Sequence, residues 1–110
     1  MADIVVDGSR HGATITLRGG DTLRLTLAEN PTTGFRWSVP GPDALAGVIA
    51  LRGDRYVAAS ASPAPGAGGL RELCFGALRP GRVEVQLQLA RPWEANAPRS
   101  TFRVVVEVVA

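Results

Sequence analysis

The sequence predicts an all-β fold, an antiparallel β-sandwich built from short strands. Apolar and polar residues alternate with a period of two in several segments, and turns that contain Gly or Pro separate these segments. No segment shows the 3.6-residue period of an amphipathic helix. The chain has 110 residues, of which 45% are hydrophobic, so we expect a single domain over residues 1–110.

The strands are expected in a regular order. Ile15 and Leu17 alternate with polar residues before the turn at Gly19-Gly20-Asp21, and the alternation is clearest from Val83 to Leu89. A turn at Gly53-Asp54 is expected to separate two strands, and Pro42–Gly47 is expected to form at most one helical turn. Ala58–Gly69 is rich in Ala, Ser, Pro and Gly, which predicts a long loop within the domain. The expected strands are 13–18, 22–27, 35–39, 48–51, 55–57, 73–75, 83–89 and 102–108.

Charge and cysteine content exclude several classes of protein. The net charge is only +2, and all twelve basic residues are arginines scattered along the chain, so no nucleic-acid partner is expected. The single cysteine excludes an intrachain disulfide. Glu107 interrupts the apolar C-terminal stretch, so no membrane partner is expected. We also expect the protein to be a monomer. A chain that starts naturally at Met1 is expected to be cytoplasmic, whereas removal of a leader would indicate a periplasmic or secreted protein.

The segment Asn30-Pro31-Thr32-Thr33-Gly34 connects two expected strands. Pro fixes one backbone dihedral, the two Thr side chains are restricted at χ1, and Gly permits a conformation that other residues avoid. Such a loop loses little entropy on binding, as an inhibitor inserted into a cleft requires. From these residues alone, an ordinary rigid turn is the alternative.

Two later connections have related chemistry. Gly66-Ala67-Gly68-Gly69 lacks the Lys and the strand–helix context of a phosphate-binding loop, but its glycines allow one backbone to approach another closely. Arg91-Pro92-Trp93 ends a strongly alternating strand. Its Trp is expected either to cover the end of the core or to be a binding anchor, since Trp is enriched at interface hot spots.

A catalytic or metal site is not expected. His11 precedes the first clear strand and Cys74 lies within another, and no Asn or Asp is placed to orient the histidine. One His, one Cys and separated carboxylates do not predict a metal site, and no cofactor is expected.

Taken in order and at this spacing, the three motifs resemble the binding loops of the chagasin family, and the resemblance extends from about Gly12 to Val109. It implies an immunoglobulin-like sandwich with three binding loops at one end, which inhibits papain-like cysteine proteases reversibly, competitively and without covalent chemistry. The first loop would cover the catalytic cysteine of the protease, with Thr32 and Thr33 nearest to it. The expected protease-binding residues are Asn30, Pro31, Thr32, Thr33, Gly34, Gly66, Ala67, Gly68, Gly69, Leu70, Arg91, Pro92 and Trp93.

Phe35 and Trp37 alternate with polar residues, so they are expected to pack into the sandwich beneath the first loop and to support it. The resemblance implies that Trp93 is the main contact of the third loop and that Arg91 orients that loop. Leu70 stands where the family commonly has Thr. The alternative function is an immunoglobulin-like adhesion or carbohydrate-binding module that uses Trp37 and Trp93 as stacking platforms.

Overall fold

The computed structural model describes residues 2–30, 33–39, 45–58, 68–91, 93 and 99–110. Within these residues the chain forms eight strands and one short 3-10 helix, η1 (Gly8–Arg10). The strands are β1 (Asp3–Asp7), β2 (Thr14–Arg18), β3 (Thr22–Glu29), β4 (Arg36–Ser38), β5 (Ile49–Ala58), β6 (Gly69–Ala77), β7 (Gly81–Ala90) and β8 (Ser100–Val109). No helix among the described residues is long and apolar enough to cross a membrane.

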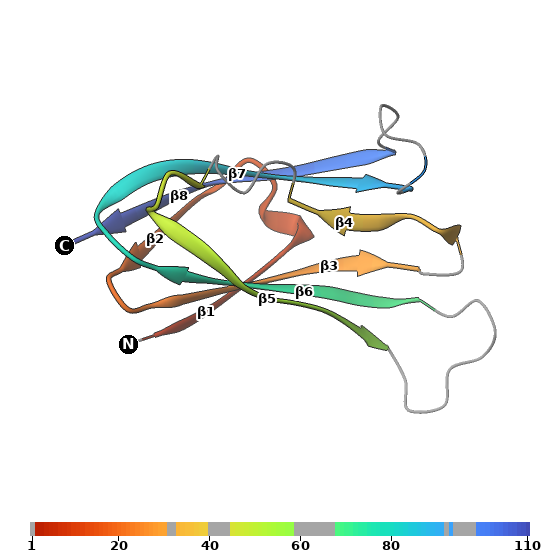
Figure 1. The fold of residues 1–110 in the computed structure, drawn as a ribbon, viewed down its shortest axis with the longest axis horizontal. Helices are drawn as coiled ribbons and strands as arrows, with labels where there is room; N and C mark the ends of the chain where they lie inside the picture. The colour runs from red at the N-terminus through yellow and green to blue at the C-terminus, as the bar shows by residue number, and fades with distance from the viewer. Residues whose placement is uncertain (1, 31–32, 40–44, 59–67, 92, 94–98) are drawn as a thin grey trace.

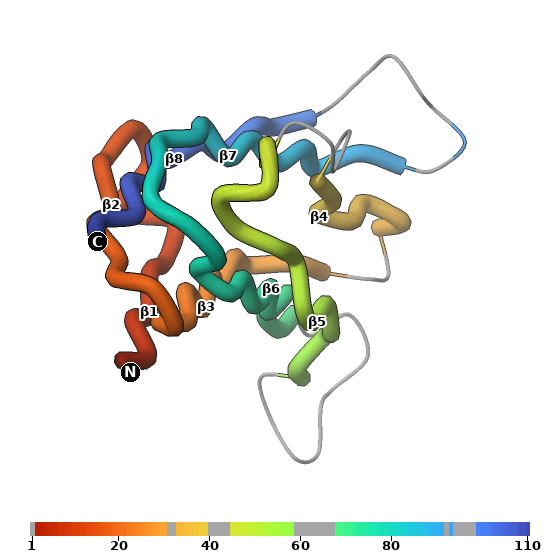
Figure 2. Tube along the Cα trace, turned by 60° about the vertical axis from the view of Figure 1, so that its left-hand side comes forward, coloured from red at the N-terminus to blue at the C-terminus, as the bar shows by residue number. Residues whose placement is uncertain are grey.

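The strands form two layers, which confirms the predicted β-sandwich (Figures 1 and 2). One sheet, here sheet A, has the order β1-β3-β6-β5, and the other, sheet B, has the order β2-β8-β7-β4. Both sheets are mixed, because β1 pairs with β3 and β2 with β8 in parallel. The chain crosses from sheet A to sheet B and back between β1 and β3, so two reversals restore its direction. Alternation of side chains predicts which face is buried, but not this direction.

The core lies between the sheets and consists of the apolar residues of the alternating segments. Leu23 and Leu25 of β3 in sheet A and Val85 and Leu87 of β7 in sheet B belong to this core, and all four are completely buried. Trp37 from β4 belongs to the same core and is 7% exposed. The strand faces were therefore predictable from the period of two.

Two expectations about strands were wrong. The turn at Gly53-Asp54 does not exist, because β5 runs continuously to Ala58. Its pairing with β6 shifts between Leu51 and Gly53, so a β-bulge takes up the extra residue, and Gly is typical of such a position. Strand β1 was not predicted, because its three consecutive apolar residues show no alternation. Of the expected helical turn, only Leu45–Gly47 lies within the described residues, where the Val48 N–H donates to the Leu45 carbonyl at 3.0 Å.

Asp21 ties the turn between β2 and β3 to the N-terminal segment. Its carboxylate accepts the backbone N–H of Arg18 at 2.9 Å and that of Ala2 at 2.8 Å. These two hydrogen bonds, that of Arg18 first, hold the pKa of Asp21 below its ordinary value, although burial acts in the opposite direction. The ionised carboxylate therefore stabilises the folded state.

We expect Asp21→Asn to lower the free energy of unfolding at neutral pH. The contribution of the carboxylate is present above the pKa of Asp in the unfolded chain, about 3.9, and is lost as the pH falls through the lower pKa of the folded state. Urea unfolding should thus show a gap between wild type and variant at neutral pH that narrows below about pH 4. A gap that does not change with pH would contradict this role.

Candidate functional site: three loops at one end of the sandwich

The strand ends that flank three connections lie at the end of the sandwich opposite to the chain termini (Figure 1). We call these connections loop 1 (residues 30–35, between β3 and β4), loop 2 (residues 59–68, between β5 and β6) and loop 3 (residues 91–99, between β7 and β8). The strand registers bring their flanks together: Glu29 and Ala58 both pair with Gly69, and Arg36 pairs with Ala90. The prediction of three loops at one end is confirmed. Of the expected binding residues, Pro31, Thr32, Gly66, Ala67 and Pro92 lie outside the described residues.

Loop 1 is held by hydrogen bonds of its own. The backbone N–H and the hydroxyl of Thr33 both donate to the Asn30 carbonyl, at 3.2 and 2.8 Å. The Thr33 hydroxyl oxygen in turn accepts the N–H of Phe35 at 3.3 Å. Gly34 has a φ of +80°, which residues with a side chain rarely adopt. These contacts fix the conformation of the described residues of loop 1, which are Asn30 and Thr33–Phe35.

Loop 3 supports loop 1 from the outside. Arg91 donates from Nε to the Thr33 carbonyl at 3.0 Å. The indole of Trp93 lies over Gly34 so closely that a Cβ there would be 2.7 Å from its Cη2 atom. Trp93 is 70% exposed, so it does not cover the core. The expectation that Trp93 covers the end of the core is therefore wrong, whereas its role as a binding anchor stays a prediction.

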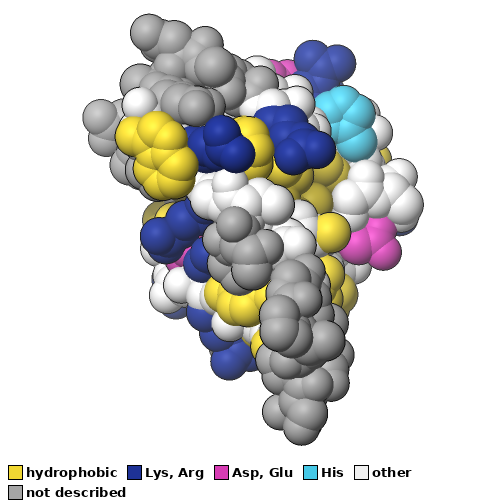
Figure 3. Space-filling model, turned by 90° about the vertical axis from the view of Figure 1, so that its right-hand side faces the viewer, with side chains coloured by type: hydrophobic (Ala, Val, Ile, Leu, Met, Phe, Trp, Pro, Cys, Tyr) yellow, Lys and Arg dark blue, Asp and Glu magenta, His cyan; other side chains and the backbone are white. Residues whose placement is uncertain are grey.

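Phe35 lies between two arginines. The guanidinium carbon of Arg91 is 4.4 Å from the centre of its ring, and that of Arg99 is 5.2 Å away. Both distances are within the range of cation–π attraction. Arg99 was missed at the sequence level, because nothing in its surroundings distinguishes it from the other arginines. Phe35 is the last residue of loop 1 and is half-buried. Figure 3 shows arginine and hydrophobic side chains next to one another across this end of the molecule.

Trp37 is the buried counterpart on the inner side. Its indole Nε1–H donates to the Ala28 carbonyl at 2.9 Å, and its backbone N–H donates to the Glu29 carboxylate at 2.7 Å. Both acceptors belong to β3 in sheet A, whereas Trp37 belongs to β4 in sheet B. Glu29 was not among the expected site residues. Its place in the alternation indicates its role, because Glu29 continues the inward-facing series of Leu23, Leu25 and Leu27 and a buried carboxylate needs a partner.

Glu29 is paired with a buried arginine. The guanidinium of Arg71 donates from Nη2 and Nε to Glu29 Oε2 at 2.7 and 3.1 Å, and from Nη1 to Asp54 at 3.1 Å. The side chains of Glu29 and Arg71 are 1% and 9% exposed. Burial by itself would lower the pKa of Arg71, but the hydrogen bonds and charges of Glu29 and Asp54 outweigh it, so this pKa is raised above its ordinary value.

At the base of loop 2, glycine is required for space. A Cβ at Gly69 would lie 2.3 Å from the Val57 carbonyl oxygen and 2.5 Å from the hydroxyl of Tyr56. At Gly68 the nearest atom to such a Cβ would be the Glu29 carbonyl oxygen, at 3.6 Å, which is an ordinary contact. Glycine is therefore required at position 69, where β5 and β6 approach closely. At position 68 a Cβ would fit without a clash.

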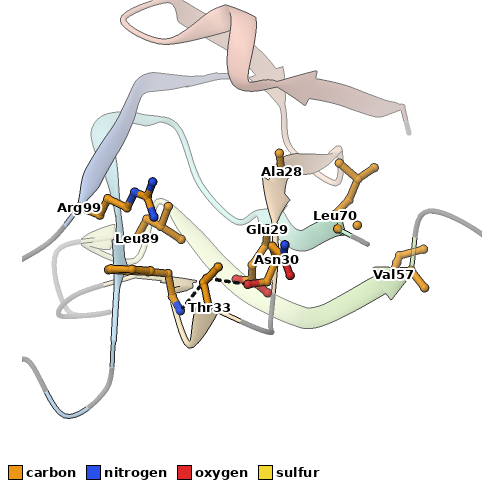
Figure 4. A pocket seen from close by; sticks show the side chains of 12 residues that line it. Ala28, Glu29, Asn30, Thr33, Val57, Leu70, Leu89 and Arg99 are labelled. Carbon is orange, nitrogen blue, oxygen red and sulfur yellow. Dashed lines mark hydrogen bonds between the residues drawn. The ribbon is translucent and has the colours of Figure 1, made fainter. Parts of the chain in front are cut away.

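A cleft of about 750 Å³ opens at this end of the sandwich (Figure 4). Glu29 and Asn30 lie in its middle, with Leu89 of sheet B and Arg99 of loop 3 on one side and Val57 and Leu70 of sheet A on the other. It joins the bases of loops 1 and 2 on the two sheets. Its lining combines apolar side chains with a few polar groups, as is typical of binding clefts.

His11 and Cys74 lie apart from one another in different environments. His11 accepts the backbone N–H of Arg103 at its Nδ1 atom and packs against Phe102, whereas Cys74 lies on β6 beside Glu72. Among the described residues, no group of three or more His, Cys, Asp or Glu side chains is arranged to hold a metal ion.

This geometry agrees with the sequence comparisons. The family model described as chagasin family peptidase inhibitor I42 matches residues 16–106. The chain belongs to the chagasin family. Amoebiasin-1 of Entamoeba histolytica is 31% identical over 99 residues, which span 89% of this chain and 92% of amoebiasin-1.

Solved structures show the same fold. The crystal structure of the cysteine protease inhibitor EhICP2 from Entamoeba histolytica matches with a TM-score of 0.83 and 25% identity, over 99% of this chain and 97% of that inhibitor. PbICP-C, solved in complex with falcipain-2, matches with a TM-score of 0.71 and 16% identity, over 96% of this chain and 99% of PbICP-C. The immunoglobulin-like sandwich of chagasin-type inhibitors is thereby confirmed for this chain.

Leu70 is the expected binding residue at which the chain departs from the common pattern of the chagasin family. It is 42% exposed and pairs with Val57, which is also exposed, on the outer face of sheet A. The chain therefore presents an apolar pair beside loop 2 at the position where the family commonly has a hydroxyl group.

We expect Gly34→Ala to destabilise the fold by about 1 kcal/mol, because alanine is strained at a positive φ. The added methyl group should also displace the Trp93 indole, which is exposed and free to move outward. In a ¹H–¹⁵N spectrum the indole signal of Trp93 should therefore shift, while that of the buried Trp37 stays in place.

The same substitution in a Trp93→Ala background provides the control. There the strain at residue 34 remains, so urea unfolding should still show a loss of about 1 kcal/mol. An unchanged Trp93 indole signal in the single variant would show that loops 1 and 3 are not in contact in solution.

Proposed function

We propose that this protein inhibits papain-like cysteine proteases reversibly by inserting loops 1, 2 and 3 into the active-site cleft. The observation that carries this proposal is the anchoring of the described residues of loop 1, which Trp37 and Glu29 hold from the inside and Arg91 and Trp93 from the outside. Residues whose conformation is already fixed lose little conformational entropy on binding. The name of EhICP2 as a cysteine protease inhibitor and the complex of PbICP-C with falcipain-2 support the same partner class.

The proposed mechanism is occlusion. Loop 1 enters the cleft with Thr32 and Thr33 nearest to the catalytic cysteine, the backbone of loop 2 follows the non-primed side, and Trp93 of loop 3 contacts the primed side. Together the loops would bury on the order of 800 Å² on each partner. The inhibitor resists cleavage because no peptide carbonyl is held over the thiolate in attack geometry. We further propose that it acts as a monomer, without a nucleic-acid or membrane partner.

A stacking module for adhesion or carbohydrate binding has less support. Trp37 is 7% exposed and packs in the core, so it offers no platform for a sugar ring or for another aromatic surface. Trp93 alone is accessible, and its neighbours in loops 1 and 3 are Gly34 and Arg91. A single accessible tryptophan therefore favours protease inhibition over a stacking module.

The purified protein should inhibit papain competitively with a dissociation constant below about 1 μM and leave trypsin and pepsin unaffected. Because none of the three loops contains an electrophile, papain with its catalytic cysteine replaced by Ala should still form the complex. Titration calorimetry with this inactive papain measures whether the complex still forms. The Cys74→Ser variant of the inhibitor should bind papain as tightly as the wild type. No inhibition at about 10 μM protein would falsify the proposed function.

Trp93→Ala should weaken papain inhibition by about thirty- to thousandfold, as expected for an aromatic hot spot. Most of the loss should appear in the dissociation rate, because the substitution changes no charge that steers the encounter. The free energy of unfolding should change by less than about 0.5 kcal/mol, since the side chain is exposed. Dissociation rates and urea unfolding measured side by side test both points; a variant that unfolds much more easily but binds normally would remove Trp93 from the interface.

A further inference from the structure

Loop 1 leaves β3 in sheet A and enters β4 in sheet B, and these two strands do not pair. We call residues 28–29 at the end of β3 and residues 36–37 at the start of β4 the neck of loop 1, and no strand pairing joins its two sides. Two hydrogen bonds from Trp37 join the two sides of the neck, and the acceptors are the Ala28 carbonyl and the Glu29 carboxylate. The position of the Glu29 carboxylate therefore decides how β3 and β4 approach one another below the loop.

Arg71 determines that position. It binds Glu29 through Nε and Nη2, and an arginine–carboxylate pair of this kind fixes orientation as well as distance. The pair is almost entirely buried, so water does not compete for these hydrogen bonds. Glu29 Oε1, which accepts the Trp37 N–H at 2.7 Å, is thereby held toward β4.

The same arginine reaches the strands that flank loop 2. Arg71 lies two residues after Gly69, where β6 begins, and its Nη1 donates to Asp54 on β5, the strand that leads into loop 2. The contacts thus run from Asp54 through Arg71 and Glu29 to Trp37, across four strands and both sheets. One connected set of polar contacts touches the flanks of loops 1 and 2.

We propose that Glu29 and Arg71 are positioning residues of the inhibitory surface: their ion pair fixes the neck of loop 1 and couples loop 1 to loop 2. This inference rests on the proposed function, since it assigns the pair a role in protease binding. Buried ion pairs often contribute little net stability, because the cost of desolvation offsets the attraction. Replacing both charges with neutral side chains of similar size should therefore preserve the fold and loosen the neck.

The decisive variant is Glu29→Gln with Arg71→Met. Arg71→Met alone leaves the Glu29 carboxylate buried without its cation, so the protein should unfold more easily and inhibit less well. The double variant should regain the urea-unfolding midpoint of the wild type, yet inhibit papain about three- to thirtyfold less tightly. A double variant that inhibits as tightly as the wild type would overturn the positioning role.

A second measurement separates positioning from stability. The backbone amide of Trp37 should exchange with solvent faster in the double variant than in the wild type, because its acceptor is no longer held by Arg71. Asp54→Asn, which changes no residue of loop 1, should shift the ¹H–¹⁵N signals of both Gly68 and Trp37. If the Trp37 signal does not move in this variant, loops 1 and 2 are not coupled through Arg71.

The exposed pair of Arg82 and Glu107 supplies the matched control. It joins β7 to β8 at 3.6 Å between Arg82 Nη1 and Glu107 Oε2, at the end of the sandwich opposite to the loops. Arg82→Met with Glu107→Gln should change neither papain inhibition nor amide exchange at Trp37, and equal losses in this control would overturn the assignment. If the wild type does not inhibit papain, the proposed function fails, whereas the exchange and shift measurements still decide the coupling of the loops.

Discussion

The hydrogen bond from the backbone N–H of Trp37 to the Glu29 carboxylate joins the two sheets below loop 1, and the position of that loop depends on it. Backbone hydrogen bonds hold each sheet together, but none of them can hold two face-packed sheets in register at their ends. Side chains must therefore define the spacing where loop 1 passes between the sheets. The carboxylate does so from a buried position and is itself held by Arg71.

Loop 1 is thus held from two directions by different kinds of interaction. Beneath it, the buried ion pair of Glu29 and Arg71, with the hydrogen bond from Trp37 to Glu29, determines where the chain leaves β3 and enters β4. Above it, Arg91 and Trp93 contact Thr33 and Gly34 from the solvent side, and cation–π contacts hold Phe35 between Arg91 and Arg99. An inhibitor that works by shape needs this order more than it needs reactive groups, because each rotamer that is already fixed lowers the entropic cost of binding.

A large part of the fold and of the site follows from local sequence patterns. Period-two alternation identifies the buried faces of β3, β7 and β8, since side chains on a strand point alternately to the two sides of a sheet. The Pro, Thr and Gly residues of loop 1 indicate a stiff connection, and the three motifs together indicate the family. The bulge in β5 was misjudged, because Gly53-Asp54 is as typical of a turn as of an irregular strand.

The sequence by itself determined the sandwich, its three motif-bearing connections and the family to which it belongs, because these depend on residue type and spacing along the chain. Only the tertiary structure decided that Trp93 faces solvent, that Arg99 joins Arg91 on the ring of Phe35, and that Glu29, Arg71 and Asp54 form one network. Glu29 and Arg71 are separated by 42 positions in the chain. Their pairing depends on the antiparallel register of β3 and β6, which no local pattern contains.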